Sequence, residues 1–272
     1  MVSIQVGATF AKGLFPEIGP LGTTTFRLGF ASLILLAFWK PWKRKWKRGE
    51  LTLIVLYGAS LGLMNLLFYF ALERTPLGVV VALEFTGPLA IALFASHRKL
   101  DFLWAGLAAF GIYLILPLRS VAVEGVSLSG ALLALGAGSC WAFYILFGKR
   151  IGADVHSGQA TAAGMTVAAL TIVPFGVVLQ GSQLIRPDLL PLGMGVAVLS
   201  SALPYSLEML ALKKLSHKTF SILMSVEPAM AALSGFLFLH EALSLKQWLA
   251  ILLIMIASAG TCLADSPTRT QR

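Results

Sequence analysis

Long apolar stretches, separated by short clusters of basic residues, prolines and glycines, form the main pattern along the chain. A helix needs about 17–25 mostly apolar residues to cross a bilayer. The pattern predicts nine such helices and a shorter tenth, Met1–Phe15, that precedes them. The nine are Gly22–Trp39, Leu51–Leu72, Leu77–Ser96, Phe102–Leu118, Ser127–Gly148, Ser157–Leu179, Leu189–Leu210, Thr219–Leu239 and Leu245–Ala264.

The composition indicates that the bilayer is the solvent of these stretches. Of the 272 residues, 57% are hydrophobic and 12% are charged, and the mean hydropathy is +0.84. Soluble domains carry about 25% charged residues, so this chain lacks the polar surface to cover its apolar residues in water. The sequence therefore predicts an all-α integral membrane protein. Its two cysteines, Cys140 and Cys262, lie in apolar runs and indicate buried small residues rather than a disulfide framework or a metal site.

The basic residues indicate how the chain is oriented. A net charge of +9 would suggest a nucleic-acid partner for a soluble protein, but here the basic residues fall in short loops between apolar runs. Strict alternation of ten spans places fifteen of them on one side of the membrane and four on the other. Basic residues concentrate in cytoplasmic loops. We therefore expect a multi-pass membrane protein with both termini cytoplasmic and no nucleic-acid partner.

The second half of the chain resembles the first. ALERTPLGVVVALEFTGP (Ala71–Pro88) aligns without gaps with ALKKLSHKTFSILMSVEP (Ala211–Pro228) at an offset of 140 residues. The charge pattern gives the two segments opposite orientations, which predicts two inverted five-helix repeats. We expect one membrane domain formed by repeat 1 (1–118) and repeat 2 (119–265), followed by a cytoplasmic tail (266–272).

The same repeat predicts a longer first helix than the chain provides. Its counterpart, Ser127–Gly148, has 22 residues, but about 15 precede Pro16. We expect that the chain begins about seven to ten residues late. The alternative is a short first helix.

Glu84 and Pro88 lie together in the third of the predicted long spans. An ionisable group at the bilayer centre costs about 2.5–3.5 kcal/mol on insertion scales, so it is a functional candidate by default. Pro88 cannot donate a hydrogen bond to the carbonyl of Glu84, and irregular backbone is tolerated there only within protein or beside a water-filled cavity. The alternative role for Glu84 is structural, as a carboxyl that is hydrogen-bonded across helices.

Two further prolines mark candidate sites in the second half. Pro228 frees the carbonyl oxygen of Met224, and Glu227 directly precedes this proline. Glu227 has the same two alternatives as Glu84. Pro204 frees the carbonyl of Ser200. Around this proline, Ser201, Tyr205 and Glu208 share one helical face.

Other polar residues within the spans are weaker candidates. Asn65 and Tyr69 share a helical face in the predicted third helix, and Trp141 and Tyr144 nearly share one in the sixth. Aromatic residues in membranes also serve as interfacial anchors or packing. Lys12 and Arg27 lie nearer to helix ends, from where long side chains can reach the interface.

Catalytic chemistry finds no support in the sequence. HExxH, GxSxG and Walker A motifs are missing, and the four histidines lie in loops or at span ends. We therefore expect no enzyme, no cofactor and no metal.

Four segments carry a resemblance to a known family: PLGVVVALEFTGPLAIALFASHRKLDF, LGAGSCWAFYILFGKR, LSSALPYSLEMLAL and LMSVEPAMAALSGFLFLHEAL. They resemble the threonine/homoserine exporters of bacterial inner membranes, which are EamA-type members of the drug/metabolite transporter superfamily. The resemblance implies ten helices in two inverted repeats, a central cavity, and export of small metabolites driven by the proton motive force. The family's E-x-x-x-P and EP segments correspond to Glu84/Pro88 and Glu227/Pro228.

Together these observations predict a secondary exporter of threonine, homoserine or similar neutral amino acids that works by alternating access. Its partners would be the amino acid, protons and the lipid bilayer. Two alternatives stay open: an exporter of another metabolite or toxic amphipathic compound, and a non-transporting membrane subunit. The oligomeric state, monomer or homodimer, also stays open. The predicted substrate or proton site comprises Asn65, Tyr69, Glu84, Trp141, Tyr205, Glu208 and Glu227, with helix breaks at Pro88, Pro204 and Pro228.

Overall fold

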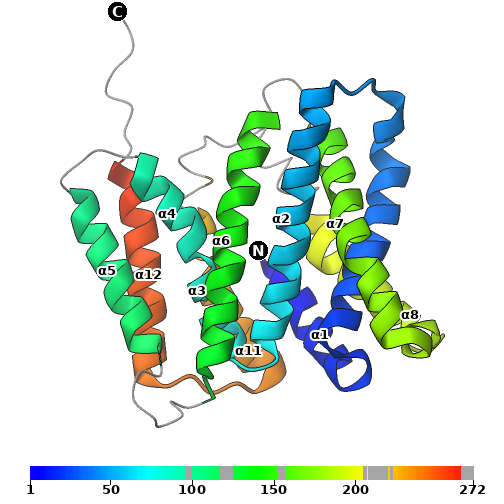
Figure 1. The fold of residues 1–272 in the computed structure, drawn as a ribbon. Helices are drawn as coiled ribbons and strands as arrows, with labels where there is room; N and C mark the ends of the chain where they lie inside the picture. The colour runs from blue at the N-terminus through cyan, green and yellow to red at the C-terminus, as the bar shows by residue number, and fades with distance from the viewer. Residues whose placement is uncertain are drawn as a thin grey trace, which may run out of the picture.

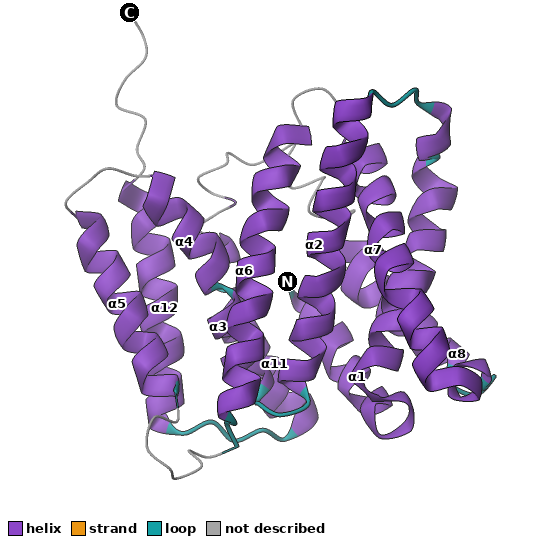
Figure 2. Cartoon of the chain, viewed as in Figure 1, coloured by secondary structure: helices purple, strands orange, loops and turns teal. Residues whose placement is uncertain are grey.

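The computed structural model describes residues 1–95, 100–116, 125–151, 157–204, 207, 220 and 223–264. Their regular structure is helical, and these residues contain no strand (Figure 2). The α-helices are α1 (Val2–Trp39), α2 (Arg48–Leu72), α3 (Leu77–Glu84), α4 (Thr86–Ala95), α5 (Leu100–Ile115), α6 (Leu128–Ile151), α7 (Ser157–Gln180), α8 (Leu190–Ala197), α11 (Glu227–Leu239) and α12 (Leu245–Ala264). Shorter elements are η1 (Pro41–Lys43), η2 (Gly181–Ile185) and the π-helical turn η3 (Val198–Ala202).

Six of the described segments are long and apolar enough to cross a membrane. Three more apolar helices are shorter: Phe102–Ile115, Leu190–Ala202 and Glu227–Leu239. The prediction of an all-α membrane protein is confirmed to this extent. The predicted ends at Leu118 and Leu210 lie outside the described residues.

The two predicted N-terminal spans lie in one element, α1, which changes direction at Gly19. Gly19 has φ 62° and ψ 177°, a conformation that only glycine adopts readily. Pro20 follows immediately, and its fixed φ suits the first turn of a helix. In Figure 1 the first part of α1 descends from the N-terminus and the second part rises toward η1. The expected break between Phe15 and Gly22 therefore exists as a tight turn, without a loop.

The predicted span Leu77–Ser96 is interrupted in its middle. Helix α3 ends at Glu84 and α4 begins at Thr86, so Phe85 is the junction. Two features favour a break here: Pro88 removes a backbone donor, and the Thr86 hydroxyl donates to the carbonyl of Leu83 (2.6 Å). The interruption is slight, because Phe85 keeps helical dihedrals, its N–H donates to the Val81 carbonyl and its carbonyl accepts from the Leu89 N–H.

Glycines set how closely neighbouring helices approach. A Cβ atom on Gly58 of α2 would lie 2.5 Å from the carbonyl oxygen of Gly164 in α7, and one on Gly62 would lie 3.1 Å from that of Ala168. The Gly58/Gly62 pair, with its small-xxx-small spacing, therefore forms a close helix–helix contact. Helix α2 also packs on α6, while α5 and α12 pack together at the other side of the molecule (Figure 1).

The surface matches a bilayer solvent. Large apolar side chains are exposed on several helices, for example Phe94, Phe102 and Val178. In lipid this exposure carries no hydrophobic cost, because the surrounding chains are as apolar as the side chains. We conclude that the described helices form a multi-pass membrane protein.

Candidate functional site

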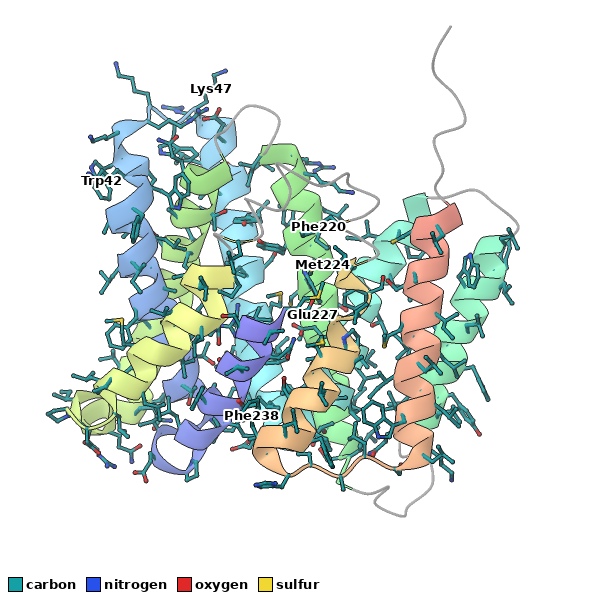
Figure 3. All side chains as sticks on the ribbon, turned by 180° about the vertical axis from the view of Figure 1, so that it is seen from behind. Trp42, Lys47, Phe220, Met224, Glu227 and Phe238 are labelled. Carbon is teal, nitrogen blue, oxygen red and sulfur yellow. The ribbon has the colours of Figure 1, made fainter. Side chains whose placement is uncertain are left out.

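A cavity of about 100 Å³ lies in the middle of the helices. In Figure 3, Met224 and Glu227 lie between the end of the molecule that carries Lys47 and the end that carries Phe238. The cavity is therefore near mid-depth rather than at either surface. Its lining combines charged, amide, aromatic and thioether side chains, from Ile4, Gln5, Ala8, Arg27, Met64, Asn65, Phe68, Val81, Glu84, Trp141, Tyr144, Met224 and Glu227.

Glu84 presents its carboxyl group to this cavity. Its side chain is 7% exposed, and it makes no hydrogen bond or ion pair with another described residue. Its charge is close enough to those of Glu227 and Arg27 to interact with them. The structural alternative for Glu84 required a hydrogen bond across helices. Among the described residues, no such bond holds this carboxyl.

Glu227 has a different environment. It is the first residue of α11, where the positive end of the helix dipole favours a carboxylate. Its Oε1 accepts a hydrogen bond from Gln5 Nε2 of α1 at 3.2 Å. Glu227 therefore lines the cavity and also links two helices, so both of its expected roles have a structural basis.

The backbone oxygen that Pro88 frees does not face the cavity as a second polar group beside the Glu84 side chain. It packs against α6: a Cβ atom on Gly138 would lie 2.5 Å from the Glu84 carbonyl oxygen. Gly87 in turn packs against the main chain of Gly138. Only glycine permits such an approach, so the helix break lies against main chain and the acid side chain alone faces the cavity.

Arg27 is the cationic group of the described cavity lining. Its side chain does not reach the interface, because the residue is 4% exposed. Three bonds hold the guanidinium: Nε donates to Ser201 Oγ (3.2 Å), Nη1 to Tyr69 Oη (3.3 Å) and Nη2 to the Ser200 carbonyl (3.0 Å). The expectation that Arg27 snorkels is wrong, because inward-facing partners satisfy it better than the distant interface.

The break at Pro204 explains one of these bonds. In an α-helix the Ser200 carbonyl would accept from residue 204, but proline has no N–H. The π-helical turn η3 widens the backbone here, and Arg27 donates to the freed oxygen. Tyr205 and Glu208, the other predicted site residues of this segment, lie outside the described residues.

The predicted aromatic and amide residues divide into two groups. Asn65 and Trp141 line the cavity. Trp141 packs edge-on against Phe85 at 5.6 Å between ring centroids, and Asn65 Nδ2 donates to the Leu61 carbonyl within its own helix (2.8 Å). Tyr69 is fully buried outside the lining and contacts the cavity through Arg27.

Sequence reasoning missed the side chains of Gln5, Met64 and Met224, and it noted Tyr144 beside Trp141 without assigning it to the site. Gln5 lies in the short first segment, where the only signal was a single amide in an apolar run. Tyr144 stacks on Tyr57, with ring centroids 4.6 Å apart and hydroxyl oxygens 3.0 Å apart. Met224 lines the cavity. The 140-residue offset between the repeats pairs it with Glu84, and this pairing could have indicated its position in the lining.

A helical membrane bundle with broken helices around a polar central cavity is the architecture of a transporter. The model of the EamA-like transporter family matches residues 1–116 and 128–263 of this chain. The chain belongs to this family.

Its relatives include named exporters. The chain is 52% identical over 263 residues to threonine/homoserine exporter RhtA of Salmonella typhimurium (strain LT2), and 51% identical to RhtA of Escherichia coli (strain K12). Each alignment covers 97% of this chain and 88% of the relative. The uncharacterized transporter YwfM of Bacillus subtilis (strain 168) is 27% identical, with 96% and 90% covered.

One solved crystal structure has the same fold. It superposes with a TM-score of 0.57 at 16% identity, and the match covers 99% of this chain and 96% of the other. This likeness extends over the whole helical domain, but at this identity it concerns the fold alone.

Proposed function

We propose that this protein exports threonine, homoserine or similar neutral amino acids from the cytoplasm across the bacterial inner membrane. The observation that carries the proposal is the central cavity, in which Arg27, Glu84 and Glu227 share one small space. A neutral amino acid is a zwitterion, so it offers an ammonium to the acids and a carboxylate to the arginine. The relatives named threonine/homoserine exporters support the choice of substrate.

The size of the cavity favours a small substrate over the alternative of a toxic amphipathic compound. Pockets for drug-sized ligands measure about 300–1,000 Å³, whereas this cavity has about 100 Å³. An amino acid with a short polar side chain fits this scale better. The methyl or methylene groups of such a substrate would contact Met64, Phe68 and Trp141.

The proposed mechanism is alternating access between two inverted five-helix repeats, driven by the proton motive force. The double match of one family model, to 1–116 and to 128–263, supports the repeat. The turn at Gly19 divides α1 into two segments, and α3 and α4, on either side of Phe85, form one. Counted in this way, the helices support ten segments. The basic loop Lys40–Arg48 supports cytoplasmic termini.

Glu84 is the proposed coupling residue. It has no hydrogen-bond partner among the described residues, so its carboxyl can exchange a proton or bind an ammonium without first breaking an internal bond. In this cycle substrate and proton would compete for the acid from opposite sides of the membrane. Glu227, which Gln5 already holds, would keep the ammonium end of the substrate in place.

Export of labelled threonine from proteoliposomes under an imposed pH gradient tests this role. We expect the wild-type protein to respond to the gradient and Glu84→Gln to lose that response. Glu73→Gln, which changes an exposed acid in the same way, should behave as wild type. Equal gradient-driven export by Glu84→Gln and the wild type would contradict the role.

Counterflow with a panel of labelled amino acids tests the substrate. We expect exchange of threonine and homoserine above that of acidic or basic amino acids. If no neutral amino acid exchanged, the amino-acid proposal would be wrong, and a panel of other metabolites would address the alternative.

A further inference from the structure

Arg27 lacks an anionic partner in the part of the chain that the structure describes. The nearest described carboxylates are not within 4.0 Å of its guanidinium, and its partners are a phenol, a serine hydroxyl and a backbone carbonyl, all neutral. A buried charge without a counter-ion is unfavourable, and more so within a bilayer. The chain retains it at a position that lines the cavity.

The bonds that hold Arg27 leave part of its donor capacity available. A guanidinium has five N–H groups, and the three described bonds use one on each nitrogen. Among the described residues, one N–H on each of the two terminal nitrogens therefore has no acceptor. That pair matches the two oxygens of a carboxylate, which arginine binds in a two-pronged, charge-assisted geometry.

The partners of Arg27 fix its orientation from outside the cavity. Tyr69 is fully buried, and its ring also lies under the guanidinium, 5.5 Å from the Arg27 Cζ atom. Ser200 and Ser201 belong to the π-helical turn before Pro204. A side chain with this many fixed contacts loses little further freedom when it binds a ligand.

We propose that Arg27 binds the α-carboxylate of the substrate and makes a free carboxylate a requirement for transport. Tyr69, Ser200 and Ser201 are positioning residues that hold the guanidinium. The acids at 84 and 227 accept the ammonium, so the cavity distinguishes the two ends of a zwitterion. The inference rests on the proposed function and specifies it: amines and amides that lack the carboxylate are excluded.

Competition in counterflow tests the requirement. Proteoliposomes with wild-type protein should exchange labelled threonine, and unlabelled homoserine should compete. Threoninamide and 1-amino-2-propanol, which keep the ammonium and hydroxyl but lack the carboxylate, should compete at least about tenfold more weakly, since a hydrogen bond to a charged group contributes about 1.5–3 kcal/mol.

Substitution of the arginine provides the second arm. Arg27→Met should raise the KM for threonine by about 10–100-fold and abolish the preference for threonine over threoninamide. Arg27→Lys keeps the charge without the two-pronged geometry and should recover only part of the affinity. Arg74→Met, an equivalent change at an exposed arginine, is the control and should leave the KM unchanged.

If Arg27→Met fails to fold, Tyr69→Phe and Ser201→Ala provide a second test, because both variants retain the Arg27 guanidinium. Each removes one positioning bond and should raise the KM a few-fold without abolishing the preference for the carboxylate. Unchanged KM values in both variants, or wild-type competition by threoninamide equal to that by threonine, would overturn the inference.

Ligand-induced stabilisation separates this inference from the proposed function. Threonine should raise the melting temperature of the detergent-purified wild-type protein, threoninamide should not, and Arg27→Met should lose the difference. If threonine stabilised the protein in this carboxylate-dependent way but was not transported, the export proposal would fail and the role of Arg27 would stand. Without any carboxylate-dependent shift, the role of Arg27 would fail.

Discussion

Lys12 Nζ lies 2.6 Å from Glu241 Oε1, so an ion pair joins residues that are 229 positions apart. The other oxygen of Glu241 accepts a hydrogen bond from the backbone N–H of Leu77, at 2.7 Å, where α3 begins. One carboxylate thus links the first part of α1, the start of α3 and the end of α11. Phe238 marks this end of the molecule in Figure 3, opposite Lys47.

This link predicts that substitutions of Lys12 and of Glu241 lower the melting temperature by different amounts. Glu241→Gln and Lys12→Met should both lower the melting temperature, and Glu241→Ala should lower it most, because it also leaves the Leu77 N–H without its acceptor. The coupling energy in a Lys12→Met/Glu241→Gln cycle should be about 0.5–3 kcal/mol. Thermal unfolding in detergent measures it. Lys246→Met, at an exposed lysine, is the control; additive effects of the two changes would show that the pair contributes no coupling.

The contact of Gly87 and Gly138 predicts intolerance of a single methyl group. Gly138→Ala places a Cβ atom 2.5 Å from the Glu84 carbonyl oxygen, and Gly87→Ala places one against the main chain of Gly138. Each should destabilise the protein by at least about 1–3 kcal/mol, as overpacking does, and reduce transport because the Glu84 carboxyl moves with its backbone. Gly106→Ala has open space around its Cβ atom and should be neutral or slightly stabilising. Equal melting temperatures for the Gly138 and Gly106 variants would contradict this packing.

Gln5 predicts an effect on transport that exceeds its effect on stability. Gln5→Leu removes the amide that donates to Glu227 Oε1. Without this hydrogen bond, the free energy of threonine binding should weaken by about 1 kcal/mol, which raises the KM for threonine about 3–10-fold. Proteoliposome counterflow measures it. Gln159→Leu, in α7 and outside the cavity lining, is the control. A large loss of melting temperature with an unchanged KM would mean that Gln5 acts only in packing.

Asp188 predicts a pH-dependent contribution to stability outside the membrane-spanning segments. A hydrogen bond from Arg186 holds the pKa of Asp188 below its ordinary value of 3.8, and Arg186 also bonds Glu17 near the turn of α1 (2.6 Å). Because the folded pKa is lowered, this contribution is present above pH 3.8 and is lost as the pH falls through the lowered value.

Melting of the wild type and of Asp188→Asn should therefore differ slightly at neutral pH and converge as the pH falls through the lowered pKa of Asp188. The difference at neutral pH should be small and should shrink in high salt, because the groups are exposed. A difference in melting temperature that persisted unchanged in acid would contradict the predicted direction of the pH dependence.

The sequence predicted the apolar helices well, because length and composition decide which segments cross a bilayer. It also located the interruption near Glu84 and the free carbonyl at Ser200, since proline has a fixed chemical consequence wherever it occurs. These are local properties that a single segment contains.

The sequence did not predict where the freed groups point. The Glu84 carbonyl meets Gly138, and the Ser200 carbonyl meets Arg27; both partners are far along the chain. Arg27 was expected to reach the interface because its span alone suggests that route, and only tertiary packing supplies the inward partners. Glu241 was missed for the same reason: outside a span, an acid gives no signal until its lysine is known.

The main-chain contact at Gly138 also has an evolutionary consequence. The backbone of α3 and α4 rests on the backbone of α6 at Gly138, and this contact, rather than a side chain of the cavity lining, fixes the height of Glu84. Met64, Trp141 and Met224, in contrast, line the cavity with their side chains. Divergence within such a protein should therefore change the size and shape of the accepted molecule through these three positions, while the acid that handles charge stays in place.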